Sequence, residues 1–380
     1  MARREGSNFG RTRPVRPHLS RQSNLYTHVH IRVGRLSFPR GYSAMAKKPR
    51  RELIDESRVG TYHCFTQAVR QAFLMGDGSL ELRDLSHRQR WVRDRIEALS
   101  SVFAVDVGDY AAMSNHMHLI LRNRPDVAAS WSDEEVARRW LLLNRHNLEL
   151  NRPARAEKIA SVAEDRDRVE KYRRRLSSIS WFMAYLKQPI ANEANLEDKK
   201  HGHFWADRFG SVELQDEEAR LACLLYVDLN RVRAGEAKVP ESAEFTGIYD
   251  RMRDRLERVE GRPHSGWLVP LSFSGDGYEG AVSQRRASDL GMLSMAEDVY
   301  LELLDREGRE KRPGKRGWIA AELPPILERL RYSAANWERA VRITNRRFER
   351  LQQKADEQAN REPRREARSD ENECGPTGAS

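Results

Sequence analysis

The sequence predicts an α+β protein built on a ferredoxin-like (RRM-like) antiparallel sheet with helices on one face. Residues 61–69, 103–113 and 116–121 are short runs of β-branched, aromatic and alternating apolar residues, a composition that is typical of strands. Between the first two runs, residues 87–101 place apolar side chains at helical spacing. The resulting order of strand, helix, strand and strand is the first half of a ferredoxin-like sandwich.

The second half of the sandwich is expected further along the chain. Apolar residues recur every three to four positions from Leu176 to Ile190, which predicts the second helix. Residues 204–214 are predicted to form the last strand, which leads into a helix starting near Asp216. Residues 125–175 are too many for a simple connection, so we expect a helical insertion there.

Positive charge is concentrated at the start of the chain. The net charge is +10, and residues 1–44 contain nine Arg, no Lys and one Glu, so they contribute +8 of it. We therefore predict a disordered basic leader over residues 1–52. Either the true start of the protein is Met45, or the leader is a basic arm that attracts phosphate groups. Because the rest of the chain carries little net charge, any nucleic-acid binding must be argued from local motifs.

Cysteine spacing and hydropathy indicate the cellular compartment in which we expect the protein. Cys64, Cys223 and Cys374 show neither metal-site nor disulfide spacing, which suits a reducing cytoplasm. The sequence has no apolar run of about 18 residues, so we expect no transmembrane helix.

Two histidines on one predicted strand form the first candidate site. In a strand at 116–121, His116 and His118 point to the same face, because successive side chains alternate. Neutral imidazoles so placed can share a metal ion. The alternative is a strand end with two hydrogen-bonded histidines. A second pair, His201 and His203, lies in a Gly- and Lys-containing turn and is expected to be exposed.

A helix about a hundred residues later provides the second candidate site. If it starts near Asp216, Tyr226 and Asn230 lie one turn apart on the same face. A tyrosine there is either a buried structural residue or a nucleophile. The helix alone leaves both open.

Together these motifs resemble the HUH single-tyrosine transposases, and more narrowly the REP-associated tyrosine transposases. The resemblance runs from Gly60 to Ala234. Family members usually have proline where this chain has Ser114 and Arg231. Four ordered blocks carry the resemblance: Gly60-Thr61-Tyr62-His63, Met113-Ser114-Asn115-His116-Met117-His118-Leu119-Ile120, Phe204-Trp205-Ala206-Asp207-Arg208-Phe209 and Tyr226-Val227-Asp228-Leu229-Asn230-Arg231-Val232-Arg233-Ala234-Gly235.

The resemblance implies an HUH endonuclease fold and a DNA strand transferase that cuts single-stranded DNA, expected beside a hairpin. Tyr226 would be the nucleophile and form a 5′-phosphotyrosine link. His116, His118 and Asn230 would hold a divalent metal, Mg²⁺ or Mn²⁺. We also considered Arg208 and Arg233 as phosphate ligands, with surface ion pairs as the alternative.

The resemblance also implies a domain organisation and a location. It assigns residues 53–240 to an HUH transposase-like catalytic domain in a protein of the prokaryotic cytoplasm or nucleoid. Residues 241–352 are expected to be a C-terminal helical module, with helices at 318–330 and 336–351 that suit either a helical hairpin or a DNA-binding helix-turn-helix. Residues 353–380 are polar and predicted to be a disordered tail.

Several alternatives stay open on the sequence alone. A DNA-binding regulator could keep the same fold without cutting. A metal-dependent hydrolase could use water as its nucleophile, with Tyr226 structural. A monomer and a homodimer are both compatible with the sequence, as are a mobile and a domesticated element.

Overall fold

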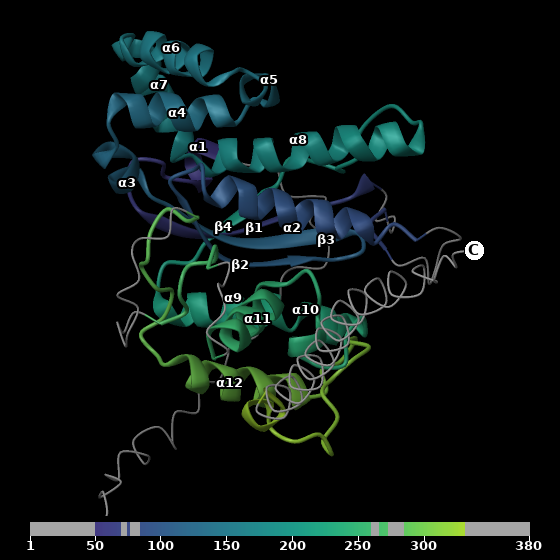
Figure 1. The fold of residues 1–380 in the computed structure, drawn as a ribbon. Coiled ribbons are helices and arrows are strands. Elements are labelled where there is room, and N and C mark those ends of the chain that lie inside the picture. Colours follow the sequence, from purple (N-terminus) through teal and green to yellow (C-terminus); the bar gives the residue numbers. More distant parts are fainter. Residues whose placement is uncertain (1–49, 70–73, 77–83, 260–265, 273–284, 331–380) are drawn as a thin grey trace, which may run out of the picture. The chain divides into compact units, whose positions relative to one another are not determined.

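The computed structural model describes residues 50–69, 74–76, 84–259, 266–272 and 285–330, all within the compact unit Ala46–Ser380 (Figure 1). The leader up to residue 49, the helix expected at 336–351 and the C-terminal tail lie outside the described residues. None of the described helices is long and apolar enough to cross a membrane.

Four strands form one antiparallel sheet in the order β2-β3-β1-β4. In the register of β1 with β3, Phe65 pairs with His118 and Gln67 with His116. The last strand is shorter than the predicted run of 204–214, because Trp205 forms only an isolated bridge with Ala68 and the chain bends over residues 206–208 before the strand begins at Gly210. The strands are β1 (Gly60–Gln67), β2 (Val105–Ala112), β3 (His116–Asn123) and β4 (Gly210–Glu213).

Side-chain caps fix where many of the helices begin. Ser132, Asn151, Asp165, Ser178 and Asp216 each accept a hydrogen bond from a backbone N–H in the first turn of the helix that follows. The helices are α1 (Arg50–Leu53), α2 (His87–Ser100), α3 (Pro125–Ser130), α4 (Asp133–Leu142), α5 (Arg145–Leu148), α6 (Arg152–Ala163), α7 (Arg166–Leu176), α8 (Ile179–Asp198), α9 (Glu217–Asp228), α10 (Asn230–Ala234), α11 (Gly247–Val259) and α12 (Glu297–Arg309), with a 3₁₀ turn η2 (Pro240–Ser242).

One predicted helix is wrong over most of its length. Residues 318–325 are not helical, and helix begins only at Ile326. Pro324 and Pro325 explain the late start, because proline has no N–H to donate and is tolerated only at the beginning of a helix.

The expectation of helices on one face of the sheet is also wrong. Helices α2 and α8 cover one face, and α9 to α12 lie on the other (Figure 1). Every residue of β2 is buried, and so is every residue of β3 except His116. A strand buried along its whole length needs cover on both faces, so the helices after β4 are part of the sheet's packing.

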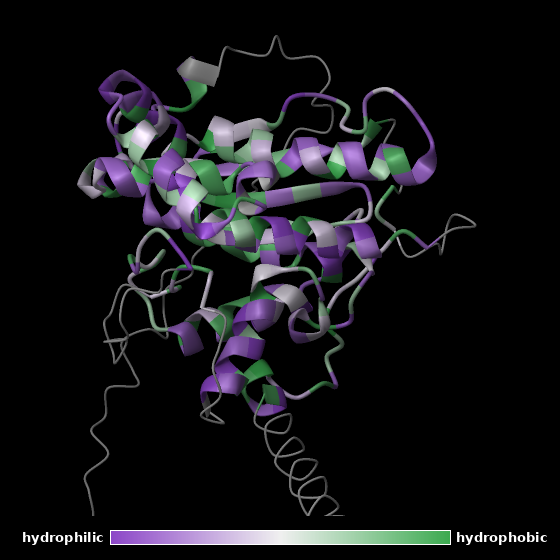
Figure 2. Ribbon diagram, turned by 45° about the horizontal axis from the view of Figure 1, so that its top comes forward, coloured by the Kyte–Doolittle hydropathy of each residue, from purple (hydrophilic) through white to green (hydrophobic). Residues whose placement is uncertain are grey.

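The apolar core lies between the sheet and the helices α2 and α8. Tyr62, Met117, Ile96, Phe182 and Leu186 are fully buried in it. Figure 2 shows hydrophobic residues gathered where helices meet the sheet and hydrophilic residues on the outer helix faces. This face is therefore packed for stability, whereas the opposite face carries buried polar groups.

Buried hydrogen bonds, most of them made by arginine side chains, join the sheet to α11 and to the segment after it. Asp106 on β2 is fully buried and accepts hydrogen bonds from Arg122 at 2.9 and 2.7 Å. Arg122 also donates to the carbonyl of Gly291 at 2.9 Å, and Ser288 donates to Asp106 at 2.8 Å. Arg251 on α11 donates to the carbonyls of Gly108 and Val269. The domain boundary at residue 240 stays a prediction, and the residues beyond it contact the sheet directly.

A pair of buried carboxyl groups lies where β2, α9 and α12 meet. Asp228 accepts hydrogen bonds from the Ile248 N–H at 3.1 Å and the Tyr300 hydroxyl at 2.5 Å. Burial raises the pKa of Asp228 to about 6. Burial, and then the charge of Asp228, raise the pKa of Asp109 well above its ordinary value. The folded protein therefore holds a proton here that the unfolded chain releases.

Replacing Arg122 with Met should lower the free energy of unfolding by about 3–5 kcal/mol, because it removes the main partner of a buried carboxylate. The matched control is Arg138→Met, whose pair with Glu135 is half-exposed and should contribute about 1 kcal/mol or less. Urea denaturation of both variants measures the two values. An equal loss of unfolding free energy in the two variants would contradict the larger contribution assigned to the buried Arg122–Asp106 pair.

The carboxyl pair should make stability depend on pH. A carboxyl whose pKa is higher in the folded state stabilises the protein below its unfolded pKa, and this stabilisation is lost as pH rises through the folded pKa. Between pH 4 and 6 the contribution of the pair to the free energy of unfolding should therefore fall by up to about 1.4 kcal/mol per pH unit for each carboxyl. The buried His63, His116 and His118, whose pKa burial lowers, contribute with the opposite sign over the same range, so the pair is isolated by comparing variants. The free energy of unfolding of Asp109→Asn relative to wild type should increase from pH 4 to pH 6, whereas that of Glu193→Gln on the exposed side of α8 should not. Parallel profiles for wild type and Asp109→Asn would refute the assignment.

Candidate functional site

Strand β3 places His116 and His118 on the sheet face that α9 covers. Their ring centroids are 4.9 Å apart and their planes nearly perpendicular, at 86°. His118 is 8% exposed, whereas His116 is half-exposed and lines a cavity. Burial lowers the pKa of His116 to about 4 and that of His118 well below its ordinary value. Both imidazoles are therefore neutral at neutral pH, as metal ligands must be.

A third histidine, His63 on β1, belongs to the same cluster and was not among the predicted site residues. Its Nε2 lies 2.9 Å from Nδ1 of His118, and the two rings stack at 5.1 Å between centroids. The sequence showed His63 only as part of the opening motif. Its position beside His118 follows from the β1–β3 register, which the sequence alone does not define.

Helix α9 brings Tyr226 to these histidines. The Tyr226 ring centroid is 5.4 Å from that of His118 and 6.2 Å from that of His63, and both contacts are edge-on. The Asp216 side chain caps the helix by accepting from the Ala219 N–H at 2.7 Å. The structure thus brings together the tyrosine and the histidine strand, which are about a hundred residues apart in sequence.

Asn230 also lies at the site, although α9 is interrupted before it. The helix ends at Asp228, and α10 begins at Asn230. Asn230 is 7% exposed and lines the cavity, and its Nδ2 is buried with no hydrogen-bond partner among the described residues. Arg231, where the family usually has proline, does not end the helix. Gly235 ends it, with a φ of +76° that glycine adopts without strain.

The donor atoms fit a divalent ion that also binds the substrate. Nε2 of His118 is buried and has no hydrogen-bond partner in the part of the chain that the structure describes, because the contact with His63 uses Nδ1. Nδ1 of His116 contacts Oδ1 of Asn115 at 2.6 Å, which leaves its Nε2 for a ligand. No group of three or more His, Cys, Asp or Glu side chains within the described residues could hold a metal ion. The protein therefore offers two imidazoles and an amide, and a metal would need further oxygens from substrate or water.

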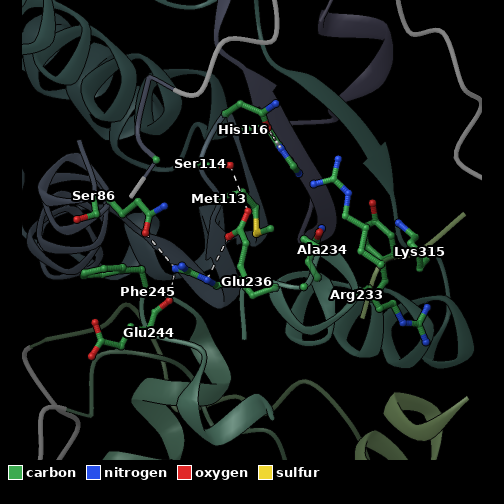
Figure 3. A pocket seen from close by; sticks show the side chains of 18 of the residues that line it. Ser86, Met113, Ser114, His116, Arg233, Ala234, Glu236, Glu244, Phe245 and Lys315 are labelled. Carbon is green, nitrogen blue, oxygen red and sulfur yellow. Dashed lines mark hydrogen bonds and ion pairs between the residues drawn. The ribbon is translucent and has the colours of Figure 1, made fainter. Parts of the chain in front are cut away.

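A cavity of about 810 Å³ opens beside these residues (Figure 3). Tyr226, His116 and Asn230 line it, together with more cationic than anionic side chains. Such a lining favours an anionic ligand. The cations are Arg90, Arg231, Arg233, Lys315 and Arg316, and the carboxylates are Glu236 and Glu244.

Contacts across the cavity wall tie α10 to the rest of the site. Arg231 donates to Gln89 of α2 at 3.0 Å and to the Glu244 carbonyl at 2.6 Å. Arg231 also pairs with Glu236, whose carboxylate accepts from the Ser114 hydroxyl at 3.2 Å. The turn before β3 and helix α10 are therefore linked through Glu236.

The two predicted phosphate ligands have different positions. Arg233 lines the cavity, is 6% exposed and lies 4.0 Å from the Glu307 carboxylate. Burial, and then the charge of Arg312, lower the pKa of Arg233 to about 10. Arg208 is exposed in the bend before β4 and does not line the cavity. His201 and His203 are exposed, in agreement with the expectation for that turn.

Comparison with known proteins leaves the family open. No protein-family model matches the chain, and a search of curated proteins finds no match. One solved structure, described as the REP-associated tyrosine transposase bound to a REP hairpin, is 13% identical over 59% of this chain and 93% of that chain. The TM-score of this match is 0.30.

Proposed function

We propose that this protein is a transposase-like DNA endonuclease and strand transferase that cuts single-stranded DNA through a covalent 5′-phosphotyrosine intermediate. In this proposal the sheet is of the ferredoxin-like HUH type. The observation that carries the proposal is the contact between Tyr226 and His118, which joins a helix-borne nucleophile to a strand-borne pair of neutral imidazoles. The cationic cavity supports it, because DNA supplies anionic phosphates.

The reaction is a transesterification at phosphorus. The Tyr226 oxygen attacks the scissile phosphorus and loses its proton to solvent, while the bond from phosphorus to the 3′ oxygen breaks. The leaving oxygen takes up a proton and becomes a free 3′-OH. The new ester retains the free energy of the phosphodiester bond, so a 3′-OH can attack it later and rejoin DNA without ATP.

Nε2 of His116, Nε2 of His118 and the Asn230 amide oxygen would hold the metal, Mg²⁺ or Mn²⁺. When bound, the ion would polarise the non-bridging phosphate oxygens. For His118 to bind the metal through Nε2, its Nδ1 must carry the proton and donate a hydrogen bond to Nε2 of His63. His63 thereby sets the tautomer and the orientation of His118.

The position of Tyr226 favours a single strand as substrate. The tyrosine is half-buried at the junction of α9 with the sheet, so a phosphate must enter the cavity to reach it. A flexible single strand can bend into such a site more easily than a stacked duplex. A non-catalytic DNA-binding regulator is the second candidate, because the cations of the cavity would serve binding alone equally well.

Tyr226→Phe should abolish the covalent protein–DNA adduct, since the variant keeps the ring packing and loses the nucleophile. Single-stranded hairpin DNA labelled at its 3′ end, incubated with Mn²⁺ and resolved on a denaturing gel, should show adduct below about 10⁻³ of the wild-type amount. Tyr185→Phe on α8 is the matched control and should retain it, because Tyr185 does not line the cavity. An undiminished adduct in Tyr226→Phe would show that another residue is the nucleophile. No adduct in wild type, together with retained DNA binding, would favour the regulator.

His63→Leu should weaken Mn²⁺ binding by about 10–100-fold, because His118 loses the partner that orients it. His63→Gln should restore most of the affinity, since its amide oxygen can accept from Nδ1 of His118. Free Mn²⁺ is measured by electron paramagnetic resonance, with thermal unfolding as a check on folding. His203→Gln is the control at an exposed position. Unchanged affinity in a folded His63→Leu variant would rule out this role.

A further inference from the structure

A loop from beyond the transposase-like segment reaches the site. Residues 310–319 leave α12 and return to it, with the Ile319 N–H donating to the Gly308 carbonyl at 2.8 Å. The loop turns at Gly314, whose φ is +73°, and the Lys315 N–H donates to the Arg312 carbonyl at 3.1 Å. Lys315 is thus held at the tip of a hydrogen-bonded turn.

The loop is fixed directly to α10. The N–H groups of Arg316 and Gly317 both donate to the Arg233 carbonyl, at 3.0 and 3.3 Å. A Cβ at position 317 would lie 2.0 Å from the Val232 carbonyl oxygen, so only glycine allows this approach. Because Asn230 and Arg233 belong to α10, the loop and the candidate site are held in one arrangement.

Lys315 belongs to the wall of the cavity. It lines the cavity with His116, Tyr226 and Asn230, and its side chain is exposed and accessible to a ligand. Figure 3 shows Lys315 on the opposite side of the cavity from Phe245. Lys315 therefore belongs to the same cavity wall as the tyrosine.

The proposed reaction needs such a cation. A phenol with an ordinary pKa near ~10 is largely protonated at neutral pH, and attack on phosphorus adds negative charge to the phosphate oxygens. A positive charge at the tyrosine end of the site, in addition to that of the metal, would stabilise both the phenolate and the phosphate oxygens. A lysine ammonium is a compact charge that suits a phosphate oxygen or a phenolate.

We propose that Lys315 is a catalytic residue whose ammonium group contacts the scissile phosphate and stabilises the charge that develops as Tyr226 attacks. This inference rests on the proposed function. It adds one residue of the loop over residues 310–319 to the active site, although the resemblance to the transposases ends at Ala234. The ammonium group stays protonated throughout, so the reaction's balance of bonds and protons is unchanged.

The test separates chemistry from binding in the full chain with Mn²⁺ and the 3′-labelled hairpin strand. Lys315→Gln should slow single-turnover adduct formation at saturating DNA by about 10²-fold, the usual loss for one group that stabilises transition-state charge. Its Kd for the strand should rise only about threefold, as for one lost phosphate contact. Lys315→Arg should recover most of the rate.

Lys311→Gln is the matched control. Lys311 belongs to the same loop and contacts the Trp318 ring at 4.6 Å, but it does not line the cavity. The control removes the same charge and should keep the wild-type rate. A wild-type rate in Lys315→Gln, or an equal loss in Lys311→Gln, would overturn the role of Lys315 and leave the proposed function intact. Absence of adduct in wild type, or an undiminished adduct in Tyr226→Phe, would overturn both.

Discussion

The burial of both faces of one small sheet is the constraint on which the rest of the structure depends. The helices after β4 cover the sheet face that bears His118 and shield this imidazole from solvent. Its pKa therefore falls well below the ordinary value. The same cover places the Tyr226 ring against that of His118. Neutral histidines and a nearby phenol are therefore consequences of packing, and an open sheet with helices on one face would provide neither.

That packing buries charged groups, and several of them have a specific partner. Arg122 pairs with Asp106, the Tyr300 hydroxyl donates to Asp228 at 2.5 Å, and the Tyr110 hydroxyl donates to Asp250 at 2.9 Å. Burying an unpaired charge costs several kcal/mol. The partners come from residues beyond 240 as well as from the sheet, so the later part of the described chain helps to cover the sheet face that bears the histidines.

The sequence predicted what local periodicity encodes and missed what long-range packing decides. Alternation and helical spacing located β1, α2, β3 and α9 to within a few residues, and placed Tyr226 one turn before Asn230. They could not predict that β2 would be buried on both faces, because Val105-Asp106-Val107 alternates like a half-buried strand and Asp106 is buried by partners distant in sequence, Arg122 and Ser288. His63 and Lys315 were missed because register and loop docking bring them to the site. Arg208 was included through its motif, although its bend points it to solvent.

The two departures from the transposase pattern meet in the structure. Ser114 and Arg231 stand where the family usually has proline, and both contact the Glu236 carboxylate. Proline at either position would have no side chain able to make these contacts, and at position 231 it would also remove the link to Gln89 of α2. A change at one position without the other would leave Glu236 with one partner fewer in the cavity wall. Through Glu236, Ser114 and Arg231 thus make one polar connection between the turn before β3 and helix α10.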